Sequence, residues 1–206
     1  MPSQTFVNLE ENKKSRVIAS AIDEFATKPF EQVMISDIIK TAKIPRGSFY
    51  QYFTDKEDLY LYIIDLIREE KLKYISKTLT NIEGLPFLDL IRKLFEDGVG
   101  FAIENPKLVR ILDHLLKNKN SLYDKLMADN MALAEEIYAN LIEIDKSKGL
   151  IRQEINTLAF AKIVVQLTSN ITFEELDLEH ESASYEKMIE RNEHIMEIIE
   201  YGVKKG

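Results

Sequence analysis

Helical periodicity of apolar side chains most constrains what this chain can fold into. Apolar residues recur three and four positions apart, which places them on one face of a helix. The first such segment runs from Glu10 to Thr27, with Ile18, Ala21, Ile22 and Phe25 on one side. The 206 residues include only seven glycines and five prolines, and no sustained apolar/polar alternation predicts strands. We therefore expect an all-α fold.

Eight further helices follow from the same pattern. Their expected ends coincide with residues that favour helix boundaries, such as proline in a first turn, asparagine at a cap and glycine at an exit. We expect them over residues 35–43, 45–53, 55–79, 86–105, 106–117, 121–148, 156–171 and 185–204. The acidic stretch ELDLEHESAS at 175–184 is interpreted as a solvated loop rather than a metal site.

The net charge of −8 is unevenly distributed along the chain. Residues 1–57 contain eight basic and eight acidic side chains, so the remaining residues carry the whole negative charge. An acidic bulk with a neutral N-terminal part suits a protein that presents only that part to DNA. Ordinary surface variation produces the same pattern, so charge alone does not decide between the two.

Several classes of function are disfavoured by what the sequence lacks. It has no cysteine, which removes disulfides and cysteine chemistry and agrees with a reducing compartment. No apolar run approaches the roughly 18 residues that a membrane span needs, and the first residues do not resemble an export signal. Phosphate-binding Gly-rich loops, HExxH pairs and GxSxG elbows are also absent. We expect a cytoplasmic protein that is not an enzyme, without cofactor, metal or membrane partner.

The two short helices expected at 35–43 and 45–53 each have two distinct faces. The first has an apolar stripe and, on another face, a polar and basic one formed by Ser36, Lys40 and Lys43. The second gathers the aromatic residues Phe49, Tyr52 and Phe53 on one side. A helix this short is not stable alone, so the aromatic side must pack against the preceding helices. Two helices separated by the break at Ile44-Pro45 predict a helix-turn-helix.

The outer faces of these two helices carry groups that suit DNA. Basic side chains neutralise phosphates, a tyrosine hydroxyl donates to them, and glycine permits close approach of the backbone. Gln51 suits adenine, Arg46 suits guanine or phosphate, and Ser48 is a third candidate reader. For each exposed side chain, solvation without function remains the alternative. The candidate DNA-binding residues are Ser36, Lys40, Lys43, Arg46, Gly47, Ser48, Tyr50, Gln51 and Lys56.

Residues 43–59, KIPRGSFYQYFTDKEDL, closely resemble the recognition segment of TetR-family regulators. That family typically shows a small residue, Ser or Thr, an apolar residue, Tyr, any residue, His or Tyr, Phe, then Lys and Leu at fixed spacing. The resemblance covers about residues 13–60 and is architectural beyond them. It implies a helix-turn-helix domain at 1–55 and a helical ligand-binding and dimerisation domain at 56–206. It also implies phosphate contacts by Tyr50 and Lys56, with Arg46, Ser48 and Gln51 facing bases.

Three residues depart from the family pattern. Met34 replaces the usual Ser or Thr cap of the second helix, which removes a hydrogen bond worth ~1 kcal/mol unless Ser36 or Asp37 compensates. Lys43 replaces the usual glycine of the turn, at a cost on the order of 1 kcal/mol if its φ is positive. Pro45 replaces the usual Ser and still suits a helix start. The departures affect the geometry expected for the turn.

The larger half offers a candidate cavity and a candidate dimer interface. Aromatic and polar side chains at helical positions suit an apolar pocket, but ordinary core residues have the same pattern. His114 is read as a core or boundary residue in preference to a ligand contact. Candidate pocket residues are Phe87, Phe95, Phe101, His114, Tyr123, Tyr138 and Gln166. Apolar stripes on the last two helices either close the core or bury against a second copy, through Phe160, Ile163, Val164, Leu167, Met188, Ile195, Met196 and Ile199.

The sequence and the resemblance together predict a ligand-responsive transcriptional regulator. As a repressor, it binds a palindromic operator as a homodimer and is released by a small, largely apolar effector. The alternative is a helical carrier of a hydrophobic small molecule without DNA binding, and an enzyme is a third option. A steep salt dependence of specific DNA binding distinguishes the regulator from the carrier.

Overall fold

The computed structural model describes residues 2–80, 84–118, 121–170 and 181–204, and its helices confirm the predicted all-α class. Contacts divide the chain into two compact units. Unit 1 comprises Met1–Leu72 with Asn105–Asn118, and unit 2 comprises Lys73–Glu104 with Lys119–Gly206. These units differ from the predicted domains 1–55 and 56–206, because a long helix and a later short one pack largely with the N-terminal helices.

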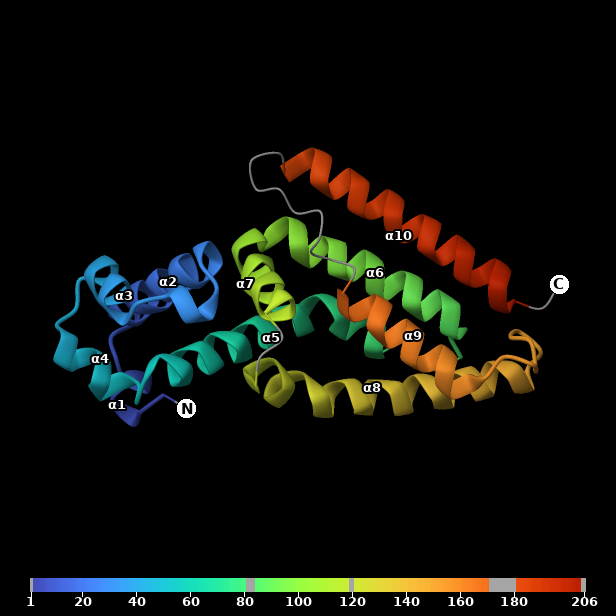
Figure 1. The fold of residues 1–206 in the computed structure, drawn as a ribbon, viewed down its shortest axis with the longest axis horizontal. Helices are drawn as coiled ribbons and strands as arrows, with labels where there is room; N and C mark the ends of the chain where they lie inside the picture. The colour runs from blue at the N-terminus through green and yellow to red at the C-terminus, as the bar shows by residue number, and fades with distance from the viewer. Residues whose placement is uncertain (1, 81–83, 119–120, 171–180, 205–206) are drawn as a thin grey trace. The chain divides into compact units, whose positions relative to one another are not determined.

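Unit 1 is a helical bundle formed mainly by the N-terminal part of the chain (Figure 1). Two segments from beyond residue 55 complete it: most of the long helix α5 and the whole of α7. Its elements are α1 (Gln4–Val7), α2 (Glu11–Thr27), the 3-10 turn η1 (Phe30–Gln32), α3 (Ile35–Ala42), α4 (Arg46–Tyr52), α5 (Lys56–Thr80) and α7 (Pro106–Lys117).

Aromatic rings form much of the core of unit 1. Phe25 of α2 lies edge-on to Tyr60 of α5, with 4.8 Å between ring centroids, and both side chains are buried. The ion pair between Lys107 and Asp23, at 2.6 Å, ties α7 to α2. Burial of these large aromatic side chains stabilises unit 1, since each such side chain removes roughly 150–250 Å² from water.

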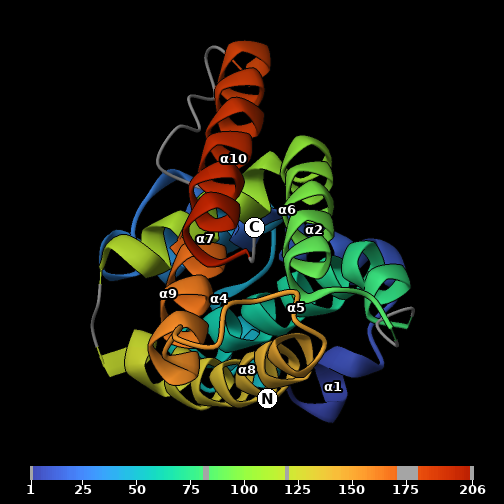
Figure 2. The ribbon, with the colours of Figure 1, turned by 90° about the vertical axis from the view of Figure 1, so that its right-hand side faces the viewer.

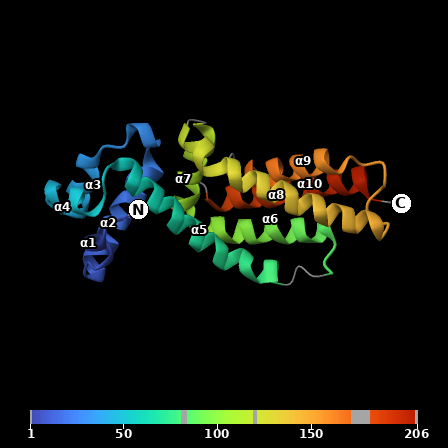
Figure 3. The ribbon, with the colours of Figure 1, turned by 90° about the horizontal axis from the view of Figure 1, so that it is seen from below.

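Unit 2 contains four long helices and the end of α5. In unit 2, α8 packs on α9 and α6 packs on α10 (Figures 1 and 2). The axes of the four helices point roughly along the same line (Figure 3). The buried carboxylate of Asp145 accepts a hydrogen bond from the backbone N–H of Phe87 at 2.7 Å, which satisfies the start of α6. The four helices are α6 (Phe87–Glu104), α8 (Ser121–Ser147), α9 (Thr157–Asn170) and α10 (Glu181–Val203).

The helix boundaries follow the predicted local chemistry. The carboxylate of Asp55 accepts from the N–H of Asp58 at 2.8 Å, and the side-chain oxygen of Asn156 accepts from the N–H of Ala159 at 2.9 Å. Gly149 has a φ of 72° at the exit of α8. These caps confirm the predicted starts of α5 and α9 and the end of α8.

Three features differ from the predicted elements. Helix α1 and the turn η1 were not predicted, because four and three residues are too few to show a periodicity. Helix α10 begins at Glu181, so residues 181–184 of the predicted acidic loop are helical instead. The rest of that loop, 175–180, lies outside the described residues.

β-Pairing in the described ranges is limited to an isolated antiparallel bridge between Ile151 and Lys204. The bridge joins the segment after α8 to the end of α10, both in unit 2. Across the same described ranges, we find no helix with the length and apolar character that crossing a membrane requires.

Candidate nucleic-acid interface

A tight turn joins α3 to α4, as predicted. Lys43 adopts the left-handed conformation (φ 53°, ψ 49°), and no other non-glycine residue in the described part of the chain has a positive φ. The N–H of Ile44 donates to the carbonyl of Ile39 at 3.1 Å, which closes the end of α3. Ile44 itself is buried. The residue with positive φ thus stands where the resemblance implies glycine.

Helix α4 has one buried face and one exposed face. Phe49, Tyr52 and Phe53 are at most 3% exposed, which confirms them as core. Tyr50 is 49% exposed. Arg46, Gly47 and Gln51 are also exposed, and Ser48 is half-buried. A Cβ built on Gly47 would meet no atom within 4 Å, so a ligand backbone can approach this point closely. The aromatic face fixes the helix and leaves the polar face free to bind.

Helix α3, like α4, has an exposed polar face. Ser36, Lys40 and Lys43 are exposed, whereas Ile38 and Ala42 are completely buried. This arrangement confirms the two predicted faces of the helix. The exposed face adds two lysines to the positive charge of Arg46, which suits a phosphate backbone.

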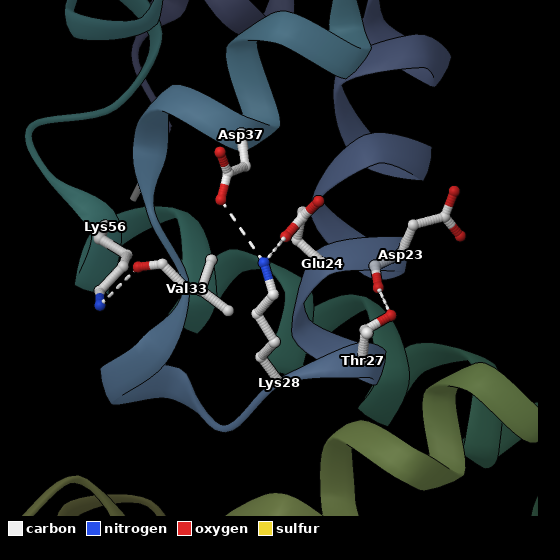
Figure 4. Close-up of polar contacts among 7 residues, drawn as sticks. All are labelled: Asp23, Glu24, Thr27, Lys28, Val33, Asp37 and Lys56. Carbon is white, nitrogen blue, oxygen red and sulfur yellow. Dashed lines mark hydrogen bonds and ion pairs between the residues drawn. The ribbon is translucent and has the colours of Figure 1, made fainter.

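The start of α3 is held by an ion pair instead of a cap. Met34 occupies the cap position and provides no side-chain hydrogen bond. The amine of Lys28 lies 3.1 Å from Glu24 of α2 and 3.5 Å from Asp37 of α3 (Figure 4). Glu24, followed by Asp37, raises the pKa of Lys28. Because Asp37 contacts Lys28, it supports the first turn of α3 by linking it to α2.

Lys56 makes contacts that the sequence did not predict. Its amine donates to the carbonyl oxygens of Phe30 at 2.7 Å, Val33 at 2.9 Å and Glu31 at 3.3 Å, and lies 4.5 Å from the Phe30 ring (Figure 4 shows the Val33 contact). A lysine ammonium has three N–H donors, and three carbonyls take them. This geometry disfavours the predicted side-chain contact with phosphate and favours a structural role in holding η1 against the start of α5.

A support for α4 that the sequence did not predict comes from the N-terminal segment. The N–H of Ser3 donates to the carbonyl of Tyr52 at 2.9 Å, and its hydroxyl donates to the carbonyl of Gln51 at 2.6 Å. These carbonyls belong to the last turn of α4, where no intrahelical donor is available. Phe6 of α1 is fully buried, with its ring centroid 4.6 Å from that of Phe53. The N-terminal segment therefore fixes the C-terminal end of α4.

A weak signal for this support is present in the sequence. Ser3 precedes four residues that form α1, and its hydroxyl accepts from the N–H of Phe6 at 3.3 Å, as an N-cap does. A cap residue followed by a single aromatic residue does not identify a partner, however. Only the structure shows that the partner is α4.

The predicted ligand-pocket residues are dispersed. Phe95 lines a pocket between α6 and α10, whereas Gln166 is exposed on α9. His114 belongs to unit 1, where its Nε2 lies 3.3 Å from the carbonyl oxygen of Ala26, which favours the boundary interpretation. Ligand contact by the others stays a prediction: Phe87 and Phe101 are buried, and Tyr123 and Tyr138 are half-buried.

Most of the predicted dimer-interface residues lie in the core of their own protomer. Ile163 is 52% exposed, and Leu167 and Ile195 are half-buried. The five others are at most 9% exposed within the single chain, which disfavours contact with a second copy, so that contact stays a prediction for Phe160, Val164, Met188, Met196 and Ile199. An amphipathic stripe shows that a helix face is buried, but not against what.

Known proteins share both the sequence of the turn region and the fold. Residues 17–63, from α2 into α5, match the family model described as bacterial regulatory proteins, tetR family. The chain is 35% identical over 85 residues to the transcriptional regulator AcuR of Cereibacter sphaeroides, and 26% identical over 125 residues to the uncharacterized HTH-type transcriptional regulator YuxN of Bacillus subtilis.

The extent of these similarities differs between sequence and structure. The two alignments cover 40% and 61% of this chain, but they span only 39% and 38% of the lengths of AcuR and YuxN. The crystal structure of a TetR family transcriptional regulator from Chloroflexus aurantiacus covers the whole of both chains, with a TM-score of 0.78 and 26% identity. Similarity therefore extends over the helices on both sides of the turn.

Proposed function

Because this chain belongs to the tetR family of bacterial regulatory proteins, we propose that it is a transcriptional regulator that binds operator DNA through α3 and α4. In this proposal a homodimer binds a palindromic operator and is released when a small, largely apolar effector binds unit 2. The observation that carries it is the two-sided packing of α4: Phe49 and Phe53 are buried, while Tyr50 and Gln51 face solvent. A fixed polar helix face is what a major groove admits.

The exposed side chains suggest separate roles in this interface. Gln51 can pair with the edge of adenine, and Arg46 with guanine or a phosphate. Ser48 is half-buried, so its hydroxyl can contact a base only if the groove comes close to α4. Tyr50, Ser36, Lys40 and Lys43 are suited to the sugar-phosphate backbone, which sets position without reading sequence.

A homodimer is supported by apolar side chains that the protomer leaves exposed. On α10, Ile198 is 72% exposed and Tyr201 is 84% exposed, and on α9 Leu158 is 74% exposed. Ile198 and Tyr201 are three positions apart and share one side of the helix. Large apolar groups in water favour association. Two copies would present two α4 helices to half-sites about 34 Å apart.

The proposed response to an effector needs a structural link between the units. Helix α5 is one continuous helix whose first part belongs to unit 1 and whose last residues belong to unit 2. A ligand shifts the protein only if it binds one conformation better than the other. Release of DNA by an effector therefore requires that the effector prefers the conformation with weaker operator affinity.

Selection of bound duplexes from random DNA tests this function. We expect a palindromic sequence whose affinity falls steeply as salt rises, because basic residues displace counterions from phosphates. Affinity that is independent of DNA sequence, or no DNA binding at low salt, would contradict the regulator and leave the carrier function. Light scattering of the same sample is expected to give the mass of a dimer.

A further inference from the structure

A pocket of about 250 Å³ opens between α6 and α10 within unit 2 (the two helices are side by side in Figures 1 and 2). Its volume is just below the roughly 300–1,000 Å³ of typical ligand pockets, so it suits only a small ligand. Four of the residues that line it are apolar and four are polar. The apolar residues are Phe95, Val99, Ile189 and Met196, and the polar ones are Arg92, Glu96, Asn192 and Glu193.

The charge of this pocket is negative despite its arginine. The guanidinium of Arg92 lies 2.6 Å from a carboxylate oxygen of Glu200, so its charge is already compensated. Glu96 and Glu193 are exposed, and no ion pair or hydrogen bond of either occurs within the described ranges. Two uncompensated carboxylates at a partly apolar pocket favour a cation over a neutral or anionic ligand.

Asn192 is a second and independent indication of a ligand. It lines the pocket, is only 6% exposed, and its side-chain oxygen has no hydrogen-bond partner in the part of the chain described here. A buried acceptor without a partner is unfavourable, because it has lost its hydrogen bonds to water. A donor group on a bound molecule would remove this cost. The ligand should therefore carry N–H donors as well as positive charge.

We propose that the pocket between α6 and α10 binds a small protonated amine with an apolar body. Its ammonium group contacts Glu96 and Glu193 and donates to Asn192, while Phe95 and Met196 pack against its apolar part. The evidence for amine binding comes from these residues and does not depend on the proposed function. Its role as the effector site rests on the proposed regulatory function, and it adds a positive charge to the largely apolar effector expected there.

Titration calorimetry of the full chain with three probes of one shape tests the site. We expect 2-phenylethylammonium to bind, the neutral 2-phenylethanol to bind at least about tenfold more weakly, and the anion 3-phenylpropanoate not to bind. Equal binding of the amine and the alcohol would overturn the electrostatic argument. Absence of amine binding at low salt would overturn the site.

Variants assign the interaction to particular side chains. Glu96→Gln and Glu193→Gln are each expected to weaken amine binding about fivefold, as loss of one partly exposed charge contact does. Glu190→Gln is the matched control, because Glu190 is exposed on the same helix and does not line the pocket. An equal loss in all three variants would reveal a general charge effect and refute the assignment.

The donor requirement has its own test. The trimethylammonium analogue of the probe keeps the charge and has no N–H group, so it should bind the wild-type chain more weakly than the primary amine. In Asn192→Leu this preference should become smaller, because only the contacts with Glu96 and Glu193 still favour an N–H donor. If the variant retains the full preference, Asn192 does not accept from the ligand.

Failure of the site and failure of the proposed function give different results. Amine binding without any specific operator supports the site and removes its regulatory role. Specific operator binding without amine binding removes the site and leaves the regulator. If both occur, a fall in operator affinity on adding the amine identifies the pocket as the effector site, and unchanged affinity shows that the effector binds elsewhere.

Discussion

The imidazole Nε2 of His114 in α7 lies 3.3 Å from the carbonyl oxygen of Ala26, near the end of α2 and 88 positions earlier in the chain. The ring is half-buried. Burial lowers the pKa of His114 below its ordinary value of 6.5, and the carbonyl of Ala26 opposes this only in part. The burial of His114, which this contact offsets only in part, therefore makes the stability of unit 1 sensitive to pH.

The sign of this dependence follows from proton linkage. As pH falls through about 6.5, the unfolded chain takes up a proton at His114 while the folded chain resists it, so the free energy of unfolding decreases. His114→Gln should reduce the difference in stability between about pH 7.5 and about pH 5.5, measured by urea unfolding. His194→Gln is the control, because His194 is exposed. The same reduction in both variants would contradict a specific role for His114.

Two substitutions on the outer face of α4 should have different effects on DNA binding. Gln51→Ala is expected to relax the preference at one base pair per half-site, by about 1–3 kcal/mol. Tyr50→Phe removes a hydroxyl suited to phosphate and should weaken binding to all operator variants alike. Competition binding against a set of single-base operator variants measures both. Equal effects on every variant operator would overturn the separate roles.

Substitutions of Lys56 and Lys40 should have different effects, the first on the stability of the fold and the second on DNA binding. Lys56→Met removes the three carbonyl contacts and is expected to lower the free energy of unfolding by roughly 1–2 kcal/mol. Lys40→Met changes an exposed side chain and should alter stability by less than about 0.5 kcal/mol. Conversely, the slope of operator affinity against salt should fall by about one in Lys40→Met and not in Lys56→Met. A reduced slope in Lys56→Met would restore its predicted contact with phosphate.

The N-terminal support of α4 should matter for both folding and operator affinity. Phe6→Ala opens a cavity beside Phe53 and should cost about 3–5 kcal/mol. Ser3→Ala is the milder test, with an expected loss of about 1 kcal/mol from its hydroxyl contacts. Thr5→Ala, in an exposed position of the same helix, is the control. Operator affinity should fall in Ser3→Ala for all sequences alike, and full affinity would show that α4 does not need this contact.

The exposed apolar residues of α10 predict a surface for association. The double variant Ile198→Glu, Tyr201→Glu places two charges on positions that are 72% and 84% exposed, so the protomer should keep its fold. Light scattering should give the mass of a monomer. Operator affinity should fall, because a monomer contacts only one half-site and binds it weakly. Leu133→Glu, on an exposed position of α8, is the control. Persistence of a dimer in the double variant would exclude this surface.

Most helices could be predicted from interactions between residues that are close in the sequence. The stripe that includes Ala21 and Phe25 predicted α2, and Asp55 and Asn156 predicted two helix starts. Positive φ at Lys43 was foreseen because the family places glycine there. These features depend on neighbours within a few residues, which the sequence contains directly.

Features that depend on distant partners could not be predicted. The amine of Lys56 reaches carbonyls more than twenty positions away, and Ser3 reaches Gln51 across 48 positions. Likewise, the stripe with Phe160 and Met196 looked the same whether it faced its own core or a second copy. Periodicity identifies a face that is buried, and only three-dimensional packing identifies the residues that bury it.

The interleaving of the two units has a consequence for biosynthesis. Neither unit is a continuous stretch, since unit 1 resumes at Asn105 after residues that belong to unit 2. A nascent chain emerging from the ribosome cannot complete unit 1 until α7 has been translated. Helix α7 supplies Lys107, which forms the ion pair with Asp23 of α2. A fragment cut after Leu72 would lack that helix. Unit 1 is thus completed only after residues 73–104 of unit 2 have been translated, although most of its own residues precede them.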